Sequence, residues 1–314
     1  MTESDGPTVV LCPGQGAQAV GMGKAWAEIH PVAQRTFAAA NEVLGFDLAS
    51  ICFEGPEDRL NRTDIAQAAI YATSVACYRA LLEQGELAED AIVSAAGLSL
   101  GEFTALHLAG AFTFEDGLRL VRLRGQAMQE AAESSPSGMV ALIGADEQQA
   151  LELCDQARGE GILVPANFNA PGQVVVSGDR DACERAVSVA EAMGLKVTPL
   201  TVAGAFHSPI MRPAAERLAD ALERVAWSEP RIPVLANVTA APHEAQIATI
   251  KFRLVAQLTS PVRWAQSMER AAADYSGNRF VELAPGKVLA GLMRRTARKV
   301  KVETHAEPTV PSNN

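Results

Sequence analysis

The sequence has 314 residues, 48% of them hydrophobic, which is enough for a full core in one large domain or in one domain with a smaller insertion. Its formal net charge of -10 argues against a general nucleic-acid binder, and the lack of an apolar run of about 18 residues argues against a membrane span. The five cysteines are scattered without a CxxC pair, and the polar, acidic start lacks a secretory-signal pattern. We therefore expect reduced thiols in a cytoplasmic protein, with no metal site and no cofactor.

The first half of the chain begins with an apolar run at 8–12 that predicts a short strand. A glycine-rich loop follows at 13–18, and it lacks the Gly-Lys-Ser/Thr of a P-loop. Two interpretations stay open for this loop: an ordinary tight turn, or a loop whose N–H groups approach a substrate. Apolar residues at helical spacing then predict helices within 31–53 and 62–84.

The segment from Gly97 to Gly101 has the Gly-x-Ser-x-Gly pattern of a nucleophile elbow, with Ser99 at its centre. A short buried strand is predicted before it at 91–96 and a helix after it at 102–108. Glycine is expected on both sides of the serine because a Cβ in so sharp a turn would collide with neighbouring backbone. A glycine-flanked loop serine with no catalytic role is the alternative.

A helix is predicted to begin at Thr113, and it carries Arg124 on its apolar stripe, near Leu120, Val121 and Met128. A charge out of water is costly unless it is paired, so Arg124 needs an anionic partner. An internal salt bridge to a core carboxylate and bidentate binding of a substrate carboxylate both satisfy that need.

Residues 138–203 change in pattern, and the predicted order of elements is strand, helix, strand, strand, helix, strand. This order is typical of a ferredoxin-like unit, bounded by glycine-containing hinges. We therefore predict an α/β fold with an α/β-hydrolase-like core and a short parallel sheet, formed by 1–133 and 206–314. The ferredoxin-like subdomain occupies 134–205.

Among the five histidines, only His207 lies in a glycine-bounded loop between the predicted subdomains, which makes it the best candidate for a general base. His243 falls in a polar loop and His305 in a segment, 302–314, predicted to be a flexible tail. Gln257 lies on the inward face of a helix predicted at 246–258, so its amide either orients His207 or satisfies partners in the core.

Seven motifs in order resemble those of the malonyl-CoA:acyl-carrier-protein transacylase family, and the resemblance runs from about Val9 to Arg295. These stretches are Pro13–Gly16 with Gly21–Gly23, Gly97–Glu102, Val121–Gly125, Asn167–Asn169 with Pro171–Gln173, Gly204–Pro209, Gln257 with Pro261–Trp264, and Pro285–Lys287.

The resemblance implies ping-pong transfer of a malonyl group from malonyl-CoA to acyl carrier protein through an acyl-serine. Ser99 is then the nucleophile, His207 its base, and the Gln257 carbonyl the group that orients His207. The remaining implied site residues are the oxyanion-hole N–H groups of Gln15 and Leu100, and Arg124, Phe206, Asn167 and Asn169 as substrate contacts. Basic residues after 286 suggest a docking patch for an acidic carrier protein at Lys287, Arg294 and Arg295.

The sequence departs from the family at Leu98, where histidine commonly precedes the serine. This puts in doubt any hydrogen bond made by that position. Phe206 resembles the malonyl-selecting form of its loop, so we expect malonyl to be preferred over methylmalonyl. We expect a monomer.

Three other functions stay open from the sequence alone. One is a serine esterase of the α/β-hydrolase type, with Ser99, Asp179 and His207 in hydrolase order. Another is a carrier-protein binding module that has lost activity. The last is a transacylase of a polyketide or polyunsaturated-lipid pathway, which shares the same chemistry.

Overall fold

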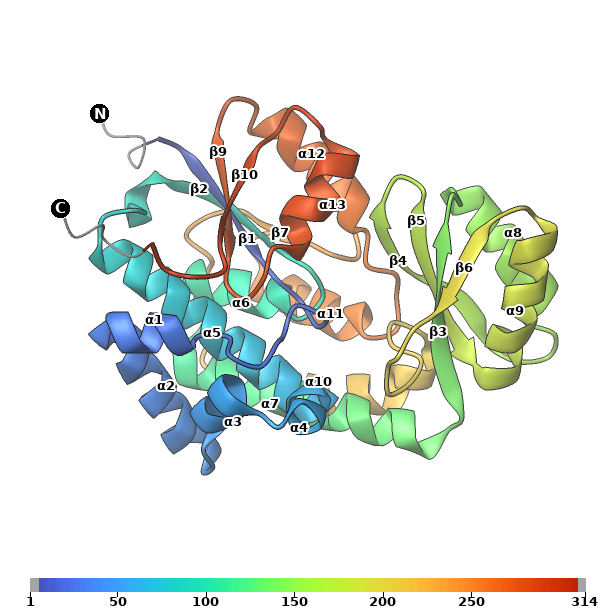
Figure 1. Cartoon of the computed structure of the whole chain (residues 1–314), viewed down its shortest axis with the longest axis horizontal. Coiled ribbons are helices and arrows are strands. Elements are labelled where there is room, and N and C mark those ends of the chain that lie inside the picture. The colour runs from blue at the N-terminus through green and yellow to red at the C-terminus, as the bar shows by residue number, and fades with distance from the viewer. Residues whose placement is uncertain (1–5, 310–314) are drawn as a thin grey trace.

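A computed structural model describes residues 6–309, which form two β-sheets that lie side by side, each covered by helices (Figure 1). The larger sheet has the strand order β10-β9-β1-β2-β7-β8. Its strands are β1 (Thr8–Cys12), β2 (Ile92–Gly97), β7 (Val234–Ala236), β8 (Ala241–Pro242), β9 (Arg279–Leu283) and β10 (Val302–His305). All neighbours pair in parallel except β7 and β8. The predicted mixed α/β fold with a parallel sheet is therefore confirmed.

Helices cover the larger sheet, and β1 at its centre is buried along its whole length. This burial explains why its sequence is a continuous apolar run and not an alternating one. The helices are α1 (Lys24–Ile29), α2 (Pro31–Leu44), α3 (Leu48–Glu54), α4 (Glu57–Asn61), α5 (Thr63–Glu83), α6 (Gly101–Leu108), α7 (Phe114–Ser134), α10 (Arg212–Glu223), α11 (Ile247–Gln257), α12 (Trp264–Asp274) and α13 (Val288–Thr296). Single 3-10 turns occur at Glu89–Ala91 and Pro209–Met211.

Helix α5 is the central helix of this body and packs against α7. By length and composition it is the one helix among the described residues that would suffice to cross a membrane, but 89% of its most apolar window is buried inside the protein. A helix that is apolar on all sides and buried within a chain is typical of a protein core. The length of α5 is therefore explained by packing.

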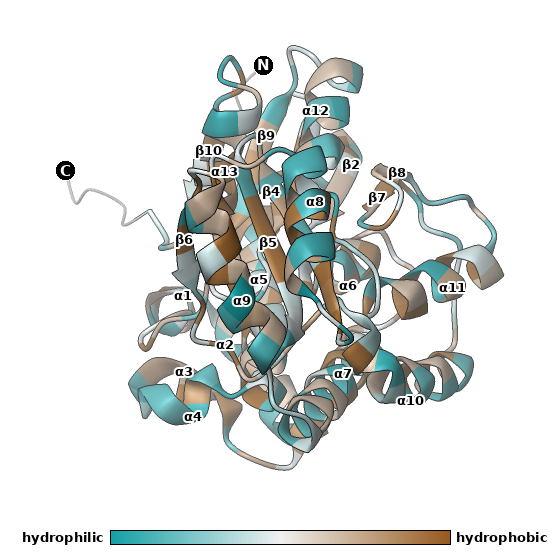
Figure 2. Cartoon of the chain, turned by 90° about the vertical axis from the view of Figure 1, so that its right-hand side faces the viewer, coloured by the Kyte–Doolittle hydropathy of each residue, from teal (hydrophilic) through white to brown (hydrophobic). Residues whose placement is uncertain are grey.

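The smaller sheet has the order β4-β5-β3-β6, and all its pairs are antiparallel. It is built from β3 (Ser137–Ile143), α8 (Glu147–Ala157), β4 (Leu163–Ala170), β5 (Gln173–Asp179), α9 (Arg180–Ala192) and β6 (Lys196–Pro199), the order of elements predicted from the sequence. In Figure 2, α8 and α9 show mostly hydrophilic colour outward, while β5 behind them is hydrophobic. Their apolar sides form a separate core cluster with the sheet.

Strand β4 of the smaller sheet is hydrogen-bonded to the segment before α12. The N–H of Phe168 donates to the carbonyl of Val262, and the N–H of Val262 donates to the carbonyl of Ala166, both at 2.9 Å. Val262 lies two residues before the start of α12, so these bonds attach the edge of the smaller sheet to the larger body.

The prediction of a flexible tail from residue 302 is wrong for the first part of that segment. Val302–His305 is β10, which pairs in parallel with β9, and Trp26 Nε1 donates to the carbonyl of Ala306 at 3.3 Å. The charged composition hid the strand, because its stability comes from the free edge of β9 and not from its own side chains. Residues 310–314 of the predicted tail lie outside the described residues.

Candidate active site

The elbow is a sharp turn between β2 and α6, and Ser99 at its tip has a positive φ of 51°. This backbone conformation is rare for a residue with a side chain and is typical of strained functional turns. A Cβ on Gly97 would lie 1.8 Å from the carbonyl carbon of Gly101, and one on Gly101 would lie 2.1 Å from the carbonyl oxygen of Cys12. Both glycines are therefore required for the steric reason predicted.

Ser99 and His207 are in contact, although 108 positions separate them. The Ser99 hydroxyl lies 2.9 Å from Nε2 of His207, and Nδ1 of His207 lies 2.7 Å from the main-chain carbonyl of Gln257. A carbonyl only accepts, so Nδ1 carries the proton and Nε2 is free to accept from the serine. The carbonyl that the resemblance implied as the orienter of His207 is therefore the main-chain carbonyl of Gln257, and the alternative that its side-chain amide orients His207 is wrong.

The buried side chain of Arg124 is held by neutral groups. Nη1 donates to Oε1 of Gln67 at 2.7 Å, and Nη2 donates to Oε1 of Gln257 at 2.8 Å and to Oγ of Ser99 at 3.0 Å. Among the described residues no carboxylate forms a salt bridge with Arg124, and its Nε has no hydrogen-bond partner. The internal salt bridge considered above is therefore wrong, and the charge stays open to an outside anion.

Burial shifts the pKa of both His207 and Arg124. Burial lowers the pKa of His207 to about 4. The positive charge of Arg124 lowers this pKa further, whereas the hydrogen bond to the Gln257 carbonyl raises it. Burial also lowers the pKa of Arg124 to about 10, which leaves the guanidinium charged at neutral pH. A neutral imidazole beside a serine hydroxyl can take the hydroxyl proton.

The loop after β1 lies against the elbow. The N–H of Leu98 donates to the carbonyl of Cys12 at 3.1 Å, and a Cβ on Gly14 would lie 2.2 Å from the carbonyl oxygen of Leu98. Gln15 follows Gly14, and Leu100 begins α6. Within the described part of the chain, the main-chain N–H groups of Gln15 and Leu100 donate to no other main-chain group, so both are available to a ligand.

The other predicted contact residues lie near this centre or on the surface. Phe206 is buried and precedes His207 in the chain. Its role in excluding a methyl branch stays a prediction. Asn167 is buried and Asn169 half-buried on β4, and neither side chain bonds to Ser99, His207 or Arg124. The three docking candidates, Lys287, Arg294 and Arg295, are exposed at α13.

The esterase triad is wrong. Oδ2 of Asp179 accepts from the N–H of Ile162 at 2.6 Å, within the smaller sheet, while the Nδ1 of His207 is used by Gln257. Asp179 has the position in the chain order that a hydrolase triad requires, but it ends β5, which belongs to the smaller sheet.

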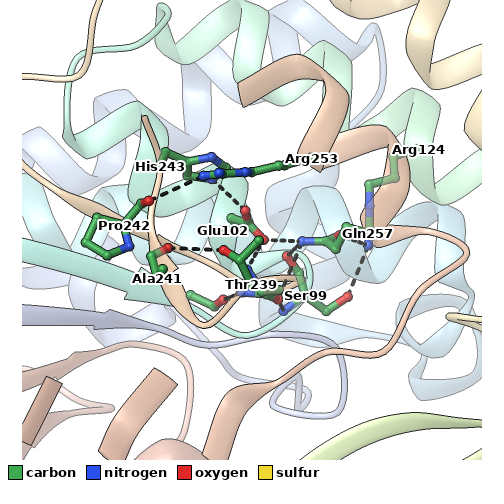
Figure 3. A network of polar contacts seen from close by, with 11 residues as sticks. Ser99, Glu102, Arg124, Thr239, Ala241, Pro242, His243, Arg253 and Gln257 are labelled. Atoms are coloured by element: carbon green, nitrogen blue, oxygen red, sulfur yellow. Dashed lines mark hydrogen bonds and ion pairs between the residues drawn. The ribbon is translucent and has the colours of Figure 1, made fainter. Parts of the chain in front are cut away.

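Sequence reasoning missed Glu102 and His243, whose side chains form a buried polar pair behind the nucleophile (Figure 3), and the buried Asn237, which bonds to the main chain of Ser99. Oδ1 of Asn237 accepts from the N–H of Ser99 at 2.6 Å, and its Nδ2 donates to the carbonyl of Gly97 at 2.7 Å. Glu102 accepts from Nε2 of Gln257 at 2.6 Å and pairs with Nε2 of His243 at 2.7 Å. The one local signal was a glutamate in the first turn after the elbow.

The chain matches the model of the acyl transferase domain over residues 9–312. It is 40% identical over 301 residues to the malonyl CoA-acyl carrier protein transacylase of Salmonella typhimurium, which covers 96% of each chain. The structure superimposes with a TM-score of 0.91 on the malonyl-CoA:acyl carrier protein transacylase of Xanthomonas oryzae pv. oryzae, at 41% identity over 98% of this chain and 96% of that one. The TM-score is also 0.91 for a chain of the structure described as a type II PKS acyl-carrier protein in complex with its malonyl-transacylase. The two chains are 38% identical, and the match covers 96% of each.

The low pKa of His207 predicts an unusual pH profile for acylation of Ser99. The imidazole loses its basicity only when it is protonated, so the rate should stay flat from about pH 8 to about pH 6 and fall as the pH approaches about 4. The check is the rate of serine acylation by an activated ester at each pH. An acid limb centred near the ordinary value of 6.5 would contradict it.

The lowered pKa of His207 also makes the stability of the fold depend on pH. The unfolded imidazole takes up a proton at 6.5 and the folded one only at about 4, so the contribution of His207 is lost as the pH falls through this window. A melting temperature measured at each pH therefore separates loss of the base from loss of the fold.

Proposed function

Because the chain belongs to the acyl transferase family, as one of its malonyl CoA-acyl carrier protein transacylases, we propose that it transfers a malonyl group from malonyl-CoA to acyl carrier protein. The observation that carries this proposal is the buried guanidinium of Arg124, bonded to Oγ of Ser99 and to neutral amide oxygens. A neutral acyl group would leave this charge without a counterion, whereas a malonyl carboxylate supplies one.

The first half of the reaction forms a malonyl-serine. Nε2 of His207 takes the proton of the Ser99 hydroxyl while the oxygen attacks the thioester carbonyl. The carbon–sulfur bond then breaks, and the departing thiolate of coenzyme A receives the proton from His207. The main-chain carbonyl of Gln257 holds Nδ1–H throughout, so that Nε2 faces the serine.

The second half reverses these steps with a different thiol. The phosphopantetheine thiol of the carrier protein gives its proton to His207 and attacks the malonyl-serine. The ester bond breaks, and Ser99 recovers its proton from His207. In both halves we infer that the negative oxygen of the tetrahedral intermediate accepts from the N–H groups of Gln15 and Leu100. Their location at the loop after β1 and at the start of α6 supports this role.

The domain assignment is also a proposal. The antiparallel order β4-β5-β3-β6, with two helices on one face, supports a ferredoxin-like subdomain at 134–205. The parallel strands and the elbow after β2 support an α/β-hydrolase-like core formed by 1–133 and 206–314. We propose a monomer, since one chain supplies every group of the site. Five free, buried cysteines favour the cytoplasm.

We assign the reaction to fatty acid synthesis, with a polyketide pathway as the second candidate. Similarity to the Salmonella enzyme over nearly the full length of both chains supports the first. Equal structural similarity to a transacylase bound to a PKS carrier protein keeps the second open. The transfer chemistry is the same in both, and they differ in the carrier protein that is accepted.

Ser99→Ala tests the function directly. Brief exposure of the wild type to malonyl-CoA should give a protein heavier by one malonyl group, located on Ser99 by peptide mass spectrometry. The Ser99→Ala variant should carry no such adduct and release no burst of coenzyme A. A wild type that stays unmodified would show that the chain is a binding module and not an enzyme.

Arg124→Ala should weaken malonyl transfer by about 10²-fold or more in kcat/KM, because it removes a buried partner of the acyl carboxylate. Acetyl transfer, which needs no such partner, should fall much less. Arg122→Ala is the matched control, since Arg122 lies on the same helix and pairs with Asp64 at 2.8 Å. Equal losses for malonyl and acetyl in Arg124→Ala would mean that the arginine is structural.

Carrier-protein docking at Lys287, Arg294 and Arg295 predicts a salt effect. Added salt screens surface charges, so the KM for an acidic carrier protein should rise several-fold. Reversal of charge by Arg294→Glu should raise the KM in the same way, whereas Arg35→Glu, which reverses an exposed arginine on α2, should not. A KM that does not change with salt would argue against electrostatic docking at α13.

A further inference from the structure

We propose that Glu102 and His243 are positioning residues that fix which end of the Gln257 amide faces Arg124, and that they thereby keep the arginine available for the acyl carboxylate. The inference rests on malonyl transfer as the reaction and identifies what makes the site selective for a carboxylated acyl group.

The Glu102 side chain is fully buried, on the first turn of α6. Its Oε2 accepts from Nε2 of Gln257 at 2.6 Å and from the N–H of Asn237 at 3.2 Å. Its Oε1 lies 2.7 Å from Nε2 of His243. Three donors therefore surround one carboxylate, which is the condition for keeping a buried charge.

A carboxylate accepts hydrogen bonds and cannot donate them, so Glu102, together with the carbonyl of Ser99, decides the orientation of the Gln257 amide. The NH2 group must face Glu102, and Oε1 must then face Arg124, where it accepts from Nη2 at 2.8 Å. In the opposite orientation the amide nitrogen would face the guanidinium, and its oxygen would face the carboxylate. Both bonds would be lost.

The network also places negative charge at a useful distance. Glu102 does not bond to Arg124 directly, because the Gln257 amide lies between them (Figure 3). A carboxylate in contact with Arg124 would neutralise it and compete with the substrate. A neutral amide oxygen holds the guanidinium in place, and the charge of Glu102 acts on it only across the amide, without a direct ion pair.

His243 completes the network from the segment that follows β8. Its N–H donates to the carbonyl of Val234 at 2.8 Å, and Nη1 of Arg253 donates to the carbonyl of Pro242 at 3.3 Å, so the segment is held on both sides. The imidazole is 2% exposed, and among the described residues its Nδ1 has no partner. Among residues 6–309, the hydrogen bond of the ring is therefore the one with Glu102, and Nε2 carries the proton because a carboxylate only accepts.

The same residues hold the nucleophile. Nε2 of Gln257 also donates to the carbonyl of Ser99 at 3.0 Å, and Asn237, whose N–H is held by Glu102, accepts from the N–H of Ser99. Loss of Glu102 should therefore lower turnover in general and malonyl turnover most of all.

The experiment compares kcat/KM for malonyl-CoA and acetyl-CoA in Glu102→Ala, Glu102→Gln and His243→Ala. We expect the malonyl-to-acetyl ratio to fall about 10-fold or more in Glu102→Ala, since the amide NH2 loses its shortest bond and keeps only the longer one to the Ser99 carbonyl. Glu102→Gln should restore the ratio to within about 3-fold of wild type, since its side-chain oxygen can replace Oε2 and its NH2 can donate to His243 in the other tautomer. Glu282→Ala is the control, because Glu282 is also fully buried but bonds to the N–H groups of Leu289 and Ala290.

The control ratio should stay at the wild-type value whatever stability is lost. A wild-type ratio in Glu102→Ala, or a Glu102→Gln variant as impaired as Glu102→Ala, would overturn the inference. If Glu102→Ala does not fold, His243→Ala decides. This variant removes one donor to Glu102, so the carboxylate is held less firmly against the Gln257 amide, and the malonyl-to-acetyl ratio must fall as well. A wild type that forms no malonyl adduct would overturn the proposed function itself, whereas a normal wild type with unchanged variant ratios overturns this inference alone.

Discussion

The unneutralised charge of Arg124 is the constraint on which the site depends. A buried guanidinium normally requires a carboxylate, and here its hydrogen-bond acceptors within residues 6–309 are the amide oxygens of Gln67 and Gln257 and the hydroxyl of Ser99. The structure therefore keeps one strong electrostatic interaction for a ligand. The same charge lowers the pKa of His207, so it helps to keep the base neutral as well as attracting the acyl carboxylate.

The sheet brings the reacting groups together by a simple rule of α/β folds. Gln15, Ser99 and Asn237 each follow the carboxyl end of a strand, and those strands, β1, β2 and β7, are neighbours in the sheet. Parallel neighbours end at the same edge, which is where such folds bind ligands. His207 and Gln257 then reach this edge from outside the sheet and complete the site.

Leu98 has a packing role in this arrangement. Its N–H bonds to Cys12, and its side chain lies against Gly14 and packs onto the apolar cluster of β1 and β2. The loop that carries Gln15 is thereby held against the elbow through backbone contact and apolar packing. A polar side chain at this position is not needed to hold the loop.

Local sterics and periodicity were enough to determine the elbow, the buried stripe of Arg124 and the α/β pattern, because glycine conformation and apolar spacing are properties of neighbouring residues. The ordered motifs added the family. Only the tertiary structure decided that the Gln257 carbonyl holding His207 is the main-chain one, that Val302–His305 is a strand, and that Glu102 meets His243 across 141 positions. Such contacts depend on which surfaces the fold brings together, and polar pairs distant in sequence leave no periodic signal in either segment.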